Sequence, residues 1–196
     1  MAFTVTNFKS NLFAANAAGG ARPSLFKIDI NFDPSTNSLS NNENILVKAA
    51  AIPAANIAAL PVNYAGRAYK MTGFRTYDNW TTTIINDENF SIRNKIQNWM
   101  YRLSGGADGT RSTTAGLSNA TSDAKVTQVG ADGADLQTWK FINLWPTELS
   151  EIALDWSSDA VEEFTCTWAY DYWTHGTSAE QKKDEVGNDD EVMGDE

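Results

Sequence analysis

The chain has a single histidine and a single cysteine among its 196 residues, so few side chains can serve as a nucleophile and its base. A serine or cysteine nucleophile needs a general base within hydrogen-bond reach. His175 borders a C-terminal stretch with almost no apolar residues, which is a poor place for such a base. Cys166 alternates with Phe164 and Trp168 in a strand-like run, and this favours a buried, inert thiol. We therefore expect no catalytic triad.

Metal and cofactor chemistry has equally little to build on. One His and one Cys exclude an internal disulfide, a Cys-rich or His-rich zinc site and a four-thiolate iron–sulfur cluster. The sequence contains no string typical of dinucleotide binding, of a P-loop or of a zinc protease. A glycosidase-like pair of carboxylates cannot be picked out among 25 acidic residues by sequence alone. We expect no cofactor, no metal and no enzymatic activity.

Charge is spread unevenly along the chain. Acidic residues outnumber basic residues by 25 to 15, and residues 177–196 hold eight acids against two bases. Because the other cations are scattered, we expect no tight general binding of nucleic acid. The composition of 177–196 favours a disordered acidic tail. The chain has no apolar run of about 18 residues, the length of a membrane span, and Lys9 interrupts the N-terminus where a signal peptide would be apolar.

Alternating apolar and polar residues predict that most of the chain is β-strand. In the clearest run, 163–173, every second residue is apolar. The stretch 87–103 changes period, since Ile92, Ile96 and Trp99 fall on one face of a helix. We expect strands over 26–32, 45–52, 69–77, 80–85, 124–129, 137–145, 148–156 and 163–173.

The predicted helix has start and stop signals. Asn86 or Asp87 can cap its first turn, and Gly105 with Gly106 suits the left-handed geometry that ends a helix. Residues 105–123 are rich in Gly, Ser and Thr, so we expect a mobile loop there.

Seven tryptophans leave open another kind of function, carbohydrate binding on exposed rings. Four of them are in phase with apolar neighbours on predicted elements, so we expect most of the rings to lie in the core. A carbohydrate-binding β-sandwich module remains an alternative. The four are Trp99, Trp139, Trp145 and Trp168.

The stretch from Pro53 to Arg67 is predicted to be a loop, yet it is unusually apolar. Side chains such as Ile57 and Leu60 need a covering surface, either the core of the same subunit or another molecule. Residues 1–22 are rich in Ala, Asn and Gly, and their apolar residues are too irregularly spaced to predict a helix, so we expect an arm with apolar anchor points. An apolar loop, such an arm and several strand edges together suggest self-assembly.

Four blocks of sequence, taken together, resemble a known family. They are ARPSLFKIDI at 21–30, IPAANIAALPVNYAGRAYKMTGFRTYDNWTTTIINDE at 52–88, INLWPTELSEIALDW at 142–156 and TWAYDYW at 167–173. Over residues 22–173 the chain resembles the tail tube protein of contractile-tailed, myovirus-type bacteriophages. The resemblance implies a mainly β fold, a β-sandwich or barrel-like tail tube fold. With the periodicity and composition described above, we expect this fold to carry one α-helix, mobile loops and a disordered acidic C-terminal tail. The loop at 105–123 and the acidic extension after Trp173 depart from the family, so the resemblance gives neither of them a role. We therefore expect an N-terminal arm (1–22), a tail-tube β domain (23–176) and the acidic tail (177–196).

The function implied by the resemblance is structural. Hexameric rings of such a subunit stack into a hollow conduit inside a contractile sheath, and the genome passes through it into the host cell. The implied partners are further copies of the chain, the tail sheath protein, a baseplate or tube initiator, the tape measure protein and the tail terminator, with DNA only as passing cargo and no membrane segment. The protein would be made in the host bacterial cytoplasm and reside in the virion. A ring-forming tube protein of a phage-tail-like injection or secretion system is the alternative.

The resemblance also gives the apolar loop a role, because the segment around Leu60, Pro61 and Val62 looks like the element that docks on the neighbouring ring. The N-terminal arm is expected to do likewise. We further expect the polar faces of two strands to line the bore and to carry more acids than bases, since a cationic bore would hold DNA phosphates. The candidate subunit and ring interface residues are Phe8, Leu12, Arg22, Pro53, Ile57, Leu60, Pro61, Val62, Tyr64 and Arg67.

Overall fold

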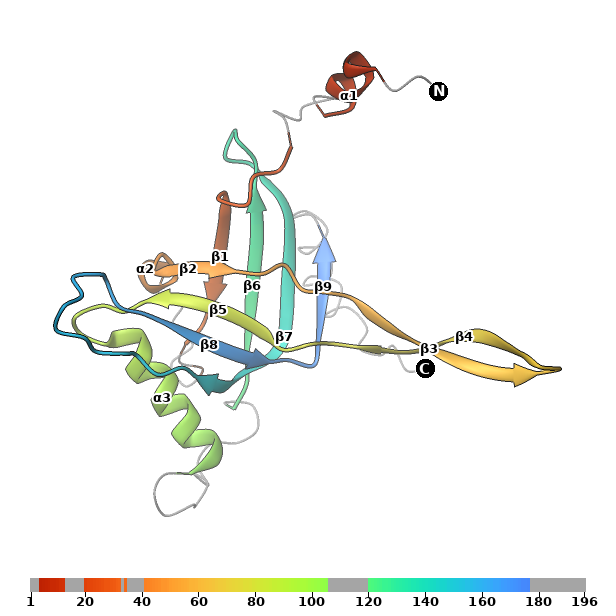
Figure 1. The fold of residues 1–196 in the computed structure, drawn as a ribbon. Coiled ribbons are helices and arrows are strands. Elements are labelled where there is room, and N and C mark those ends of the chain that lie inside the picture. Colours follow the sequence, from red (N-terminus) through yellow and green to blue (C-terminus); the bar gives the residue numbers. More distant parts are fainter. Residues whose placement is uncertain (1–3, 13–19, 33, 35–40, 106–119, 177–196) are drawn as a thin grey trace, which may run out of the picture.

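The computed structural model describes residues 4–12, 20–32, 34, 41–105 and 120–176, and Figure 1 shows how their elements are arranged. The acidic tail and most of the predicted mobile loop, residues 106–119, lie outside the described residues. In chain order the elements are α1 (Val5–Leu12), β1 (Phe26–Ile30), α2 (Asn41–Asn44), β2 (Val47–Ala50), β3 (Asn56–Tyr64), β4 (Arg67–Thr76), β5 (Trp80–Ile85), α3 (Ser91–Ser104), β6 (Ser122–Val129), β7 (Asp135–Leu149), β8 (Glu163–Ala169) and β9 (Tyr172–Gly176).

Two four-stranded antiparallel sheets share the long strand β7. Sheet A has the order β1-β6-β7-β9, and sheet B has the order β7-β8-β5-β2. The first part of β7 pairs with β6 and β9, and its last part pairs with β8. Asn143 lies between these parts with a positive φ of 56°, a local conformation that redirects the strand. In Figure 1 the strands of sheet B cross those of sheet A, so the body is a sandwich of crossed sheets.

The core lies between the two sheets. The β5–β8 register places Trp80 opposite Trp168 and Thr82 opposite Cys166, and all four side chains are buried. The Trp168 indole N–H donates to the Thr82 hydroxyl at 2.9 Å, so the polar atoms of this region are paired. The prediction of a buried Cys166 is confirmed, and burial raises the pKa of its thiol. Each large side chain buried here stabilises the fold by roughly 1.5–3 kcal/mol.

The predicted helix is confirmed as α3, which packs into the core through Ile92, Ile96 and Trp99. The Trp99 ring lies 5.8 Å from the Trp168 ring, so the helix contacts sheet B directly. This contact explains the helical spacing of the apolar residues, because one face of α3 must meet the sheet.

The ends of α3 follow the sequence signals in part. The chain first makes a turn in which the Phe90 N–H donates to the Asp87 carbonyl at 2.9 Å, so the helix begins at Ser91 rather than at 87. The Asp87 carboxylate then accepts the Ser91 N–H at 2.9 Å. At the other end Gly105 has a φ of 84°, a positive value that suits glycine, but its ψ of 161° lies outside the left-handed helical region that the sequence predicted.

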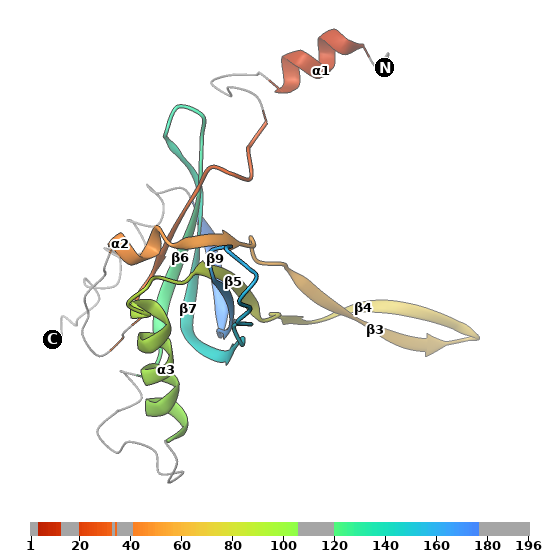
Figure 2. The same ribbon diagram turned by 60° about the vertical axis from the view of Figure 1, so that its left-hand side comes forward.

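The predicted loop from Pro53 to Arg67 is wrong. Strand β3 occupies most of this stretch and pairs with β4 in a two-stranded ribbon that projects away from both sheets (Figures 1 and 2). Two features hid it from sequence reasoning. The turn is Ala65–Gly66 instead of a typical Asn–Gly pair, and Pro61 argues against a strand inside a sheet.

Other differences concern the C-terminal half. A separate strand over 148–156 is wrong, because β7 runs on to Leu149 and residues 150–162 form a connection without a strand. The single predicted strand over 163–173 is two strands, β8 and β9, because the chain turns at Tyr170 and Asp171. The Asp171 N–H donates to the Ile142 carbonyl at 3.1 Å in this turn.

Two smaller expectations also need correction. The structure has three helices in the described residues instead of one, although α2 spans four residues and α1 eight. Trp145 is not a core residue, because it is 38% exposed, and Trp139 is only half-buried. Trp99 and Trp168 are buried as expected.

Candidate assembly interface

The β3–β4 ribbon, residues 56–76, is called the hairpin from here on. Ala65 and Gly66 at its tip have φ values of 49° and 75°, the two positive angles that a type I′ turn requires. Counting back from this turn, Pro61 falls at a position that does not hydrogen-bond to β4. Its missing N–H therefore leaves the ladder intact and faces the outer edge of the hairpin.

The register gives the hairpin two unlike faces, because residues directly opposite each other in a ladder share a face. Leu60 lies directly opposite Met71 in the ladder, and Val62 lies directly opposite Tyr69. With Tyr64 they form the apolar face of the hairpin, on which the five side chains are between 46% and 73% exposed. The opposite face carries Ala59, Pro61, Asn63, Ala68, Lys70 and Thr72. An apolar surface of this kind, left uncovered by its own subunit, indicates a docking surface.

Gly73 allows the two strands of the hairpin to approach closely. A Cβ at this position would lie 2.9 Å from the Ala58 carbonyl oxygen and 3.2 Å from Leu60 Cγ. The register shifts here, between Ile57 and Ala59, and such a bulge increases the twist of the ribbon. The glycine thus sets how the apolar face is turned relative to the body.

Aromatic residues of the body hold the base of the hairpin. The Trp173 indole N–H donates to the Ala54 carbonyl at 3.2 Å. The Arg75 guanidinium lies 5.9 Å from the centre of the Trp173 ring, a cation–π contact. The Tyr77 ring meets the Tyr170 ring edge-on at 6.1 Å. These contacts fix the direction in which the hairpin leaves the body.

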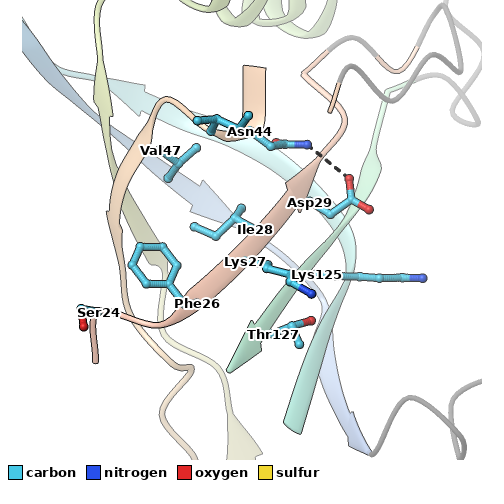
Figure 3. A pocket seen from close by; sticks show the side chains of 10 residues that line it. Ser24, Phe26, Lys27, Ile28, Asp29, Asn44, Val47, Lys125 and Thr127 are labelled. Carbon is cyan, nitrogen blue, oxygen red and sulfur yellow. Dashed lines mark hydrogen bonds between the residues drawn. The ribbon is translucent and has the colours of Figure 1, made fainter. Parts of the chain in front are cut away.

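A groove of about 600 Å³ opens where the outermost strands of the two sheets, β1 and β2, approach each other (Figure 3). Phe26, Ile28 and Val47 line its apolar part. The Asn44 side chain accepts the Ile30 N–H at 3.0 Å and so covers one end of the β1 edge. Among the described residues that line the groove there is one carboxylate, that of Asp29, so the acid–base pair of a glycosidase is not found in it.

Residues 21–176 match the family model described as phage tail tube protein. The chain belongs to the phage tail tube protein family. The tail tube protein gp19 of Enterobacteria phage T4 is 33% identical over 155 residues, which cover 78% of this chain and 90% of that protein. The tail tube protein of Serratia phage KSP90 is 23% identical over 170 residues, which cover 85% of this chain and 94% of that protein.

Solved structures of contractile injection systems share the fold of this tail tube protein. A chain of the PVC sheath–tube complex in the extended state has a TM-score of 0.53 at 14% identity, covering 89% of this chain and 99% of that one. A chain of the anti-feeding prophage baseplate has a TM-score of 0.61 at 10% identity, covering 82% and 97%. These similarities show the fold alone, whereas the similarity to the phage tail tube proteins shows the family.

Two predictions from the sequence are confirmed by these findings. The fold is the mainly β tail tube fold. The protein is a structural tail tube subunit of a contractile tail and so a component of the virion. The family is a structural one and not a class of enzymes.

Six of the ten predicted interface residues of this tail tube subunit lie on the hairpin. Pro53 is half-buried just before it. Arg22 is exposed ahead of β1, and its carbonyl accepts the Gln128 side-chain amide at 2.7 Å. Phe8 and Leu12 are on α1, which stands well away from the hairpin in Figures 1 and 2. The six on the hairpin are Ile57, Leu60, Pro61, Val62, Tyr64 and Arg67.

Strand β4 supplies interface candidates that sequence reasoning missed. Tyr69 and Met71 complete the apolar face, and Phe74 is 88% exposed near the bulge. The alternation of Tyr69 and Met71 with polar or small residues is visible in the sequence. It predicted a strand, but only the pairing with β3 reveals that its apolar side has no cover within the subunit.

The chemistry of the described residues agrees with a structural role. Within 4–12, 20–32, 34, 41–105 and 120–176, no helix is long and apolar enough to cross a membrane. The same residues contain no cluster of His, Cys, Asp or Glu suited to a metal ion. His175 is exposed on β9, where its ring meets the Trp173 ring edge-on at 5.7 Å.

Proposed function

We propose that this tail tube subunit forms hexameric rings that stack into a hollow conduit for the phage genome, and that the hairpin joins each ring to the next. The observation that carries the proposal is the apolar face of the hairpin. Fully burying a side chain of this size is worth roughly 1.5–3 kcal/mol. Five such side chains, repeated around a ring, supply enough free energy to hold successive rings together because all subunits engage at once.

Sheet A offers a way to close the ring. Its outermost strands are β1 and β9, and four antiparallel strands in the order β1-β6-β7-β9 make these two run in opposite directions. The β9 of one subunit can therefore add to the β1 of its neighbour as one more antiparallel pair. A closed ring of this kind leaves no sheet edge open, which removes the risk of uncontrolled edge pairing.

Sheet B offers the surface that lines the bore. Its outer face carries threonines from β5 and β8, with Glu148, Glu163 and Lys48 as charged groups. Lys48 and Glu163 form an ion pair at 2.5 Å, so the remaining charge is acidic. The outer face of sheet A carries Lys27, Lys125, Lys140 and Asp29. Lys27 is paired with Asp135 and Lys140 with Asp123, so this face has no acidic excess and keeps the cation of Lys125 beside Asp29. DNA slides past an acidic wall more freely than past a cationic one, which favours sheet B as the wall.

The other expected partners stay part of the proposal. Similar solved chains come from a sheath–tube complex, a sheath and tube terminator and a baseplate. The same kinds of partner suit this subunit, namely a sheath protein outside, an initiator and a terminator at the two ends, and a tape measure protein inside. The division into an arm (1–22), a tail-tube domain (23–176) and an acidic tail (177–196), together with synthesis in the host cytoplasm, belongs to the same proposal.

Negative-stain electron microscopy of the full chain, alone and with a tube initiator, tests the stacking role. Wild-type protein is expected to form hollow tubes. Leu60→Asp places a charge on the apolar face and is expected to leave folded subunits or single rings. Ala59→Asp places the same charge on the opposite face, one residue away, and is the matched control. Normal tubes from Leu60→Asp, or equal loss in both variants, would contradict the proposed role of the apolar face.

The bore assignment has its own test. Thr83→Cys places a thiol on the outer face of sheet B, and Thr127→Cys places one on the outer face of sheet A. Native Cys166 is buried and does not interfere. In assembled tubes a maleimide attached to a large polymer is expected to spare the thiol at 83, because the polymer cannot enter the bore, and to react with the thiol at 127. The reverse pattern would place sheet A at the bore.

A further inference from the structure

The two ends of sheet B differ in what they present. The hairpin leads into β5 at Trp80, and β5 runs from there to Ile85. Because β8 is antiparallel to β5, with Ile85 opposite Glu163, the connection from β7 to β8 lies at the end away from the hairpin. Figure 1 shows the hairpin and this connection on opposite sides of the body. Residues 150–162 are called the far-end loop below.

The far-end loop exposes large apolar side chains. Leu154, Trp156 and Val161 are 81%, 106% and 69% exposed. Trp156 is held outward by a turn. In this turn the Asp155 carboxylate accepts the Ser157 backbone N–H at 2.9 Å and the Ser157 hydroxyl at 2.8 Å. These hydrogen bonds also lower the pKa of Asp155, so the turn keeps its negative charge. A fully exposed tryptophan on an ordered turn is suited to contact another molecule.

The hairpin and the far-end loop carry opposite charges. Residues 56–76 contain three cations and no acid, whereas residues 150–162 contain four acids and no cation. Complementary charges of this kind steer two surfaces together and fix their register. The hairpin cations are Arg67, Lys70 and Arg75, and the loop acids are Glu151, Asp155, Asp159 and Glu162.

We propose that the far-end loop is the surface on which the hairpin of a subunit in the next ring docks. The inference rests on the proposed stacking function and names the second surface of that contact. The apolar face of one copy covers Leu154 and Trp156 of the other. Arg67 shares this face as the ladder partner of Tyr64 and meets the carboxylates of the loop, and Lys70, on the opposite face of the thin ribbon, adds to the attraction at longer range. Since the two surfaces lie at opposite ends of one subunit, the contact is head-to-tail and leaves one of them free at each end of the stack. Such a contact can add ring after ring, because nothing in the contact itself sets the length of the stack.

Charge reversal tests this pairing in the full chain. Arg67→Glu with Lys70→Glu reverses the charge of the hairpin. Glu151→Lys with Asp159→Lys reverses two of the charges of the far-end loop and leaves the turn at Asp155 intact. Each pair alone is expected to raise the protein concentration needed for tubes at least about tenfold, because like charges then face each other. All four substitutions in one chain are expected to restore that concentration to within about threefold of wild type, because the charges match again.

The matched control changes charge elsewhere. Asp189→Lys with Asp190→Lys alters the net charge as much as the loop pair does and is expected to leave tube formation unchanged. The docking proposal is overturned if the fourfold variant assembles no better than either pair, or if the control variant loses tube formation to the same degree. In both cases tubes formed by the wild type still support the proposed stacking function. Wild-type protein that forms no tubes even with an initiator overturns both proposals.

A second readout follows Trp156 itself. Its emission is obtained as the difference between wild type and Trp156→Phe, each measured as free subunit and as tube. On assembly this difference signal is expected to move to shorter wavelength and to become protected from iodide, because the ring leaves water. Quenching by iodide that stays as efficient in tubes as in free subunits would overturn the docking, whatever the charge variants do.

Discussion

Strands β3 and β8 have similar sequence patterns and opposite surroundings. Strand β8 buries Phe164, Cys166 and Trp168 in the sandwich, and its intervening residues face outward. Strand β3 also carries large apolar side chains, among them Leu60 and Val62, but all of its nine residues are exposed. The difference is that β8 has a second sheet facing it and β3 has only β4 beside it. Apolar alternation therefore serves folding in β8, whereas in β3 it supplies the exposed surface for the association proposed above.

This contrast implies that stability and assembly are separable in the molecule. The sandwich and α3 supply the free energy of folding, and the hairpin contributes little to it because its side chains gain no cover within the subunit. Substitutions in the two regions should then affect different measurements. The following variants, from the largest expected effect to the smallest, test how complete that separation is.

The largest loss of stability is expected for Trp168→Ala. This side chain is fully buried and its ring lies against Trp99 and Phe32. Removing it should lower the free energy of unfolding by about 3–5 kcal/mol, measured by urea denaturation of the unassembled subunit. Tyr69→Ala on the hairpin is the matched aromatic control and should change it by less than about 0.5 kcal/mol. Comparable losses of unfolding free energy in both variants would show that the hairpin contributes to folding as much as the core does.

A smaller loss is expected for Thr82→Val. The threonine hydroxyl accepts the Trp168 indole N–H, and valine leaves that buried donor unpaired. The free energy of unfolding should fall by about 1–3 kcal/mol in the same denaturation experiment. Thr72→Val, an exposed threonine of the hairpin, should stay within about 0.5 kcal/mol of wild type. An unchanged midpoint for Thr82→Val would show that the indole finds another acceptor.

Removing most of the hairpin is expected to alter stability even less. Replacing residues 58–74 by Asn–Gly joins Ile57 to Arg75, which already face each other in the ladder, and keeps the anchored base. The unfolding free energy should change by less than about 1 kcal/mol, since only a loop is shortened, while microscopy should find no tubes. A shortened chain that fails to fold would assign the hairpin to folding as well as to assembly.

The smallest effect on stability is expected from the ionisation of the Cys166 thiol. Burial raises the pKa of its thiol, so in the folded subunit the thiolate does not form and a thiol reagent at pH 8 should react only after unfolding. The unfolded chain ionises near its ordinary pKa of about 8.5, so stability is unaffected below that pH and falls as the pH rises above it. A thiol that reacts readily in the folded subunit would mean that the core opens.

The sequence predicted the body better than the hairpin. Strands β5, β6 and β8 and the helix α3 were found because each has one buried face, and burial on one face is what periodicity reports. The hairpin lacks a buried face, has Ala65 where a turn favours Asn, and contains Pro61, so the usual signals are weak. Helix α1 was missed although Val5, Phe8 and Leu12 lie three and four residues apart, because the residues around them are polar and small.

The candidate interface was only half predictable for a related reason. Leu60, Val62 and Tyr64 were found because apolar residues in a predicted loop are unexpected. Tyr69 and Met71 were hidden because apolar residues in a predicted strand are normal. Trp156 was placed in a predicted strand, and its full exposure depends on β7 ending at Leu149, which no local pattern indicates.

The direct connection of the hairpin to sheet B has a mechanical consequence. Strands β3 and β4 lead through short segments into β2 and β5, so a force applied at the hairpin tip acts nearly along these strands. Strand β5 is joined to β8 through six paired residues, from Trp80 opposite Trp168 to Ile85 opposite Glu163. A pull along the strands loads these pairs in shear, so they must yield together instead of opening one at a time. A contracting tail can therefore load the subunit heavily without peeling its sheets apart.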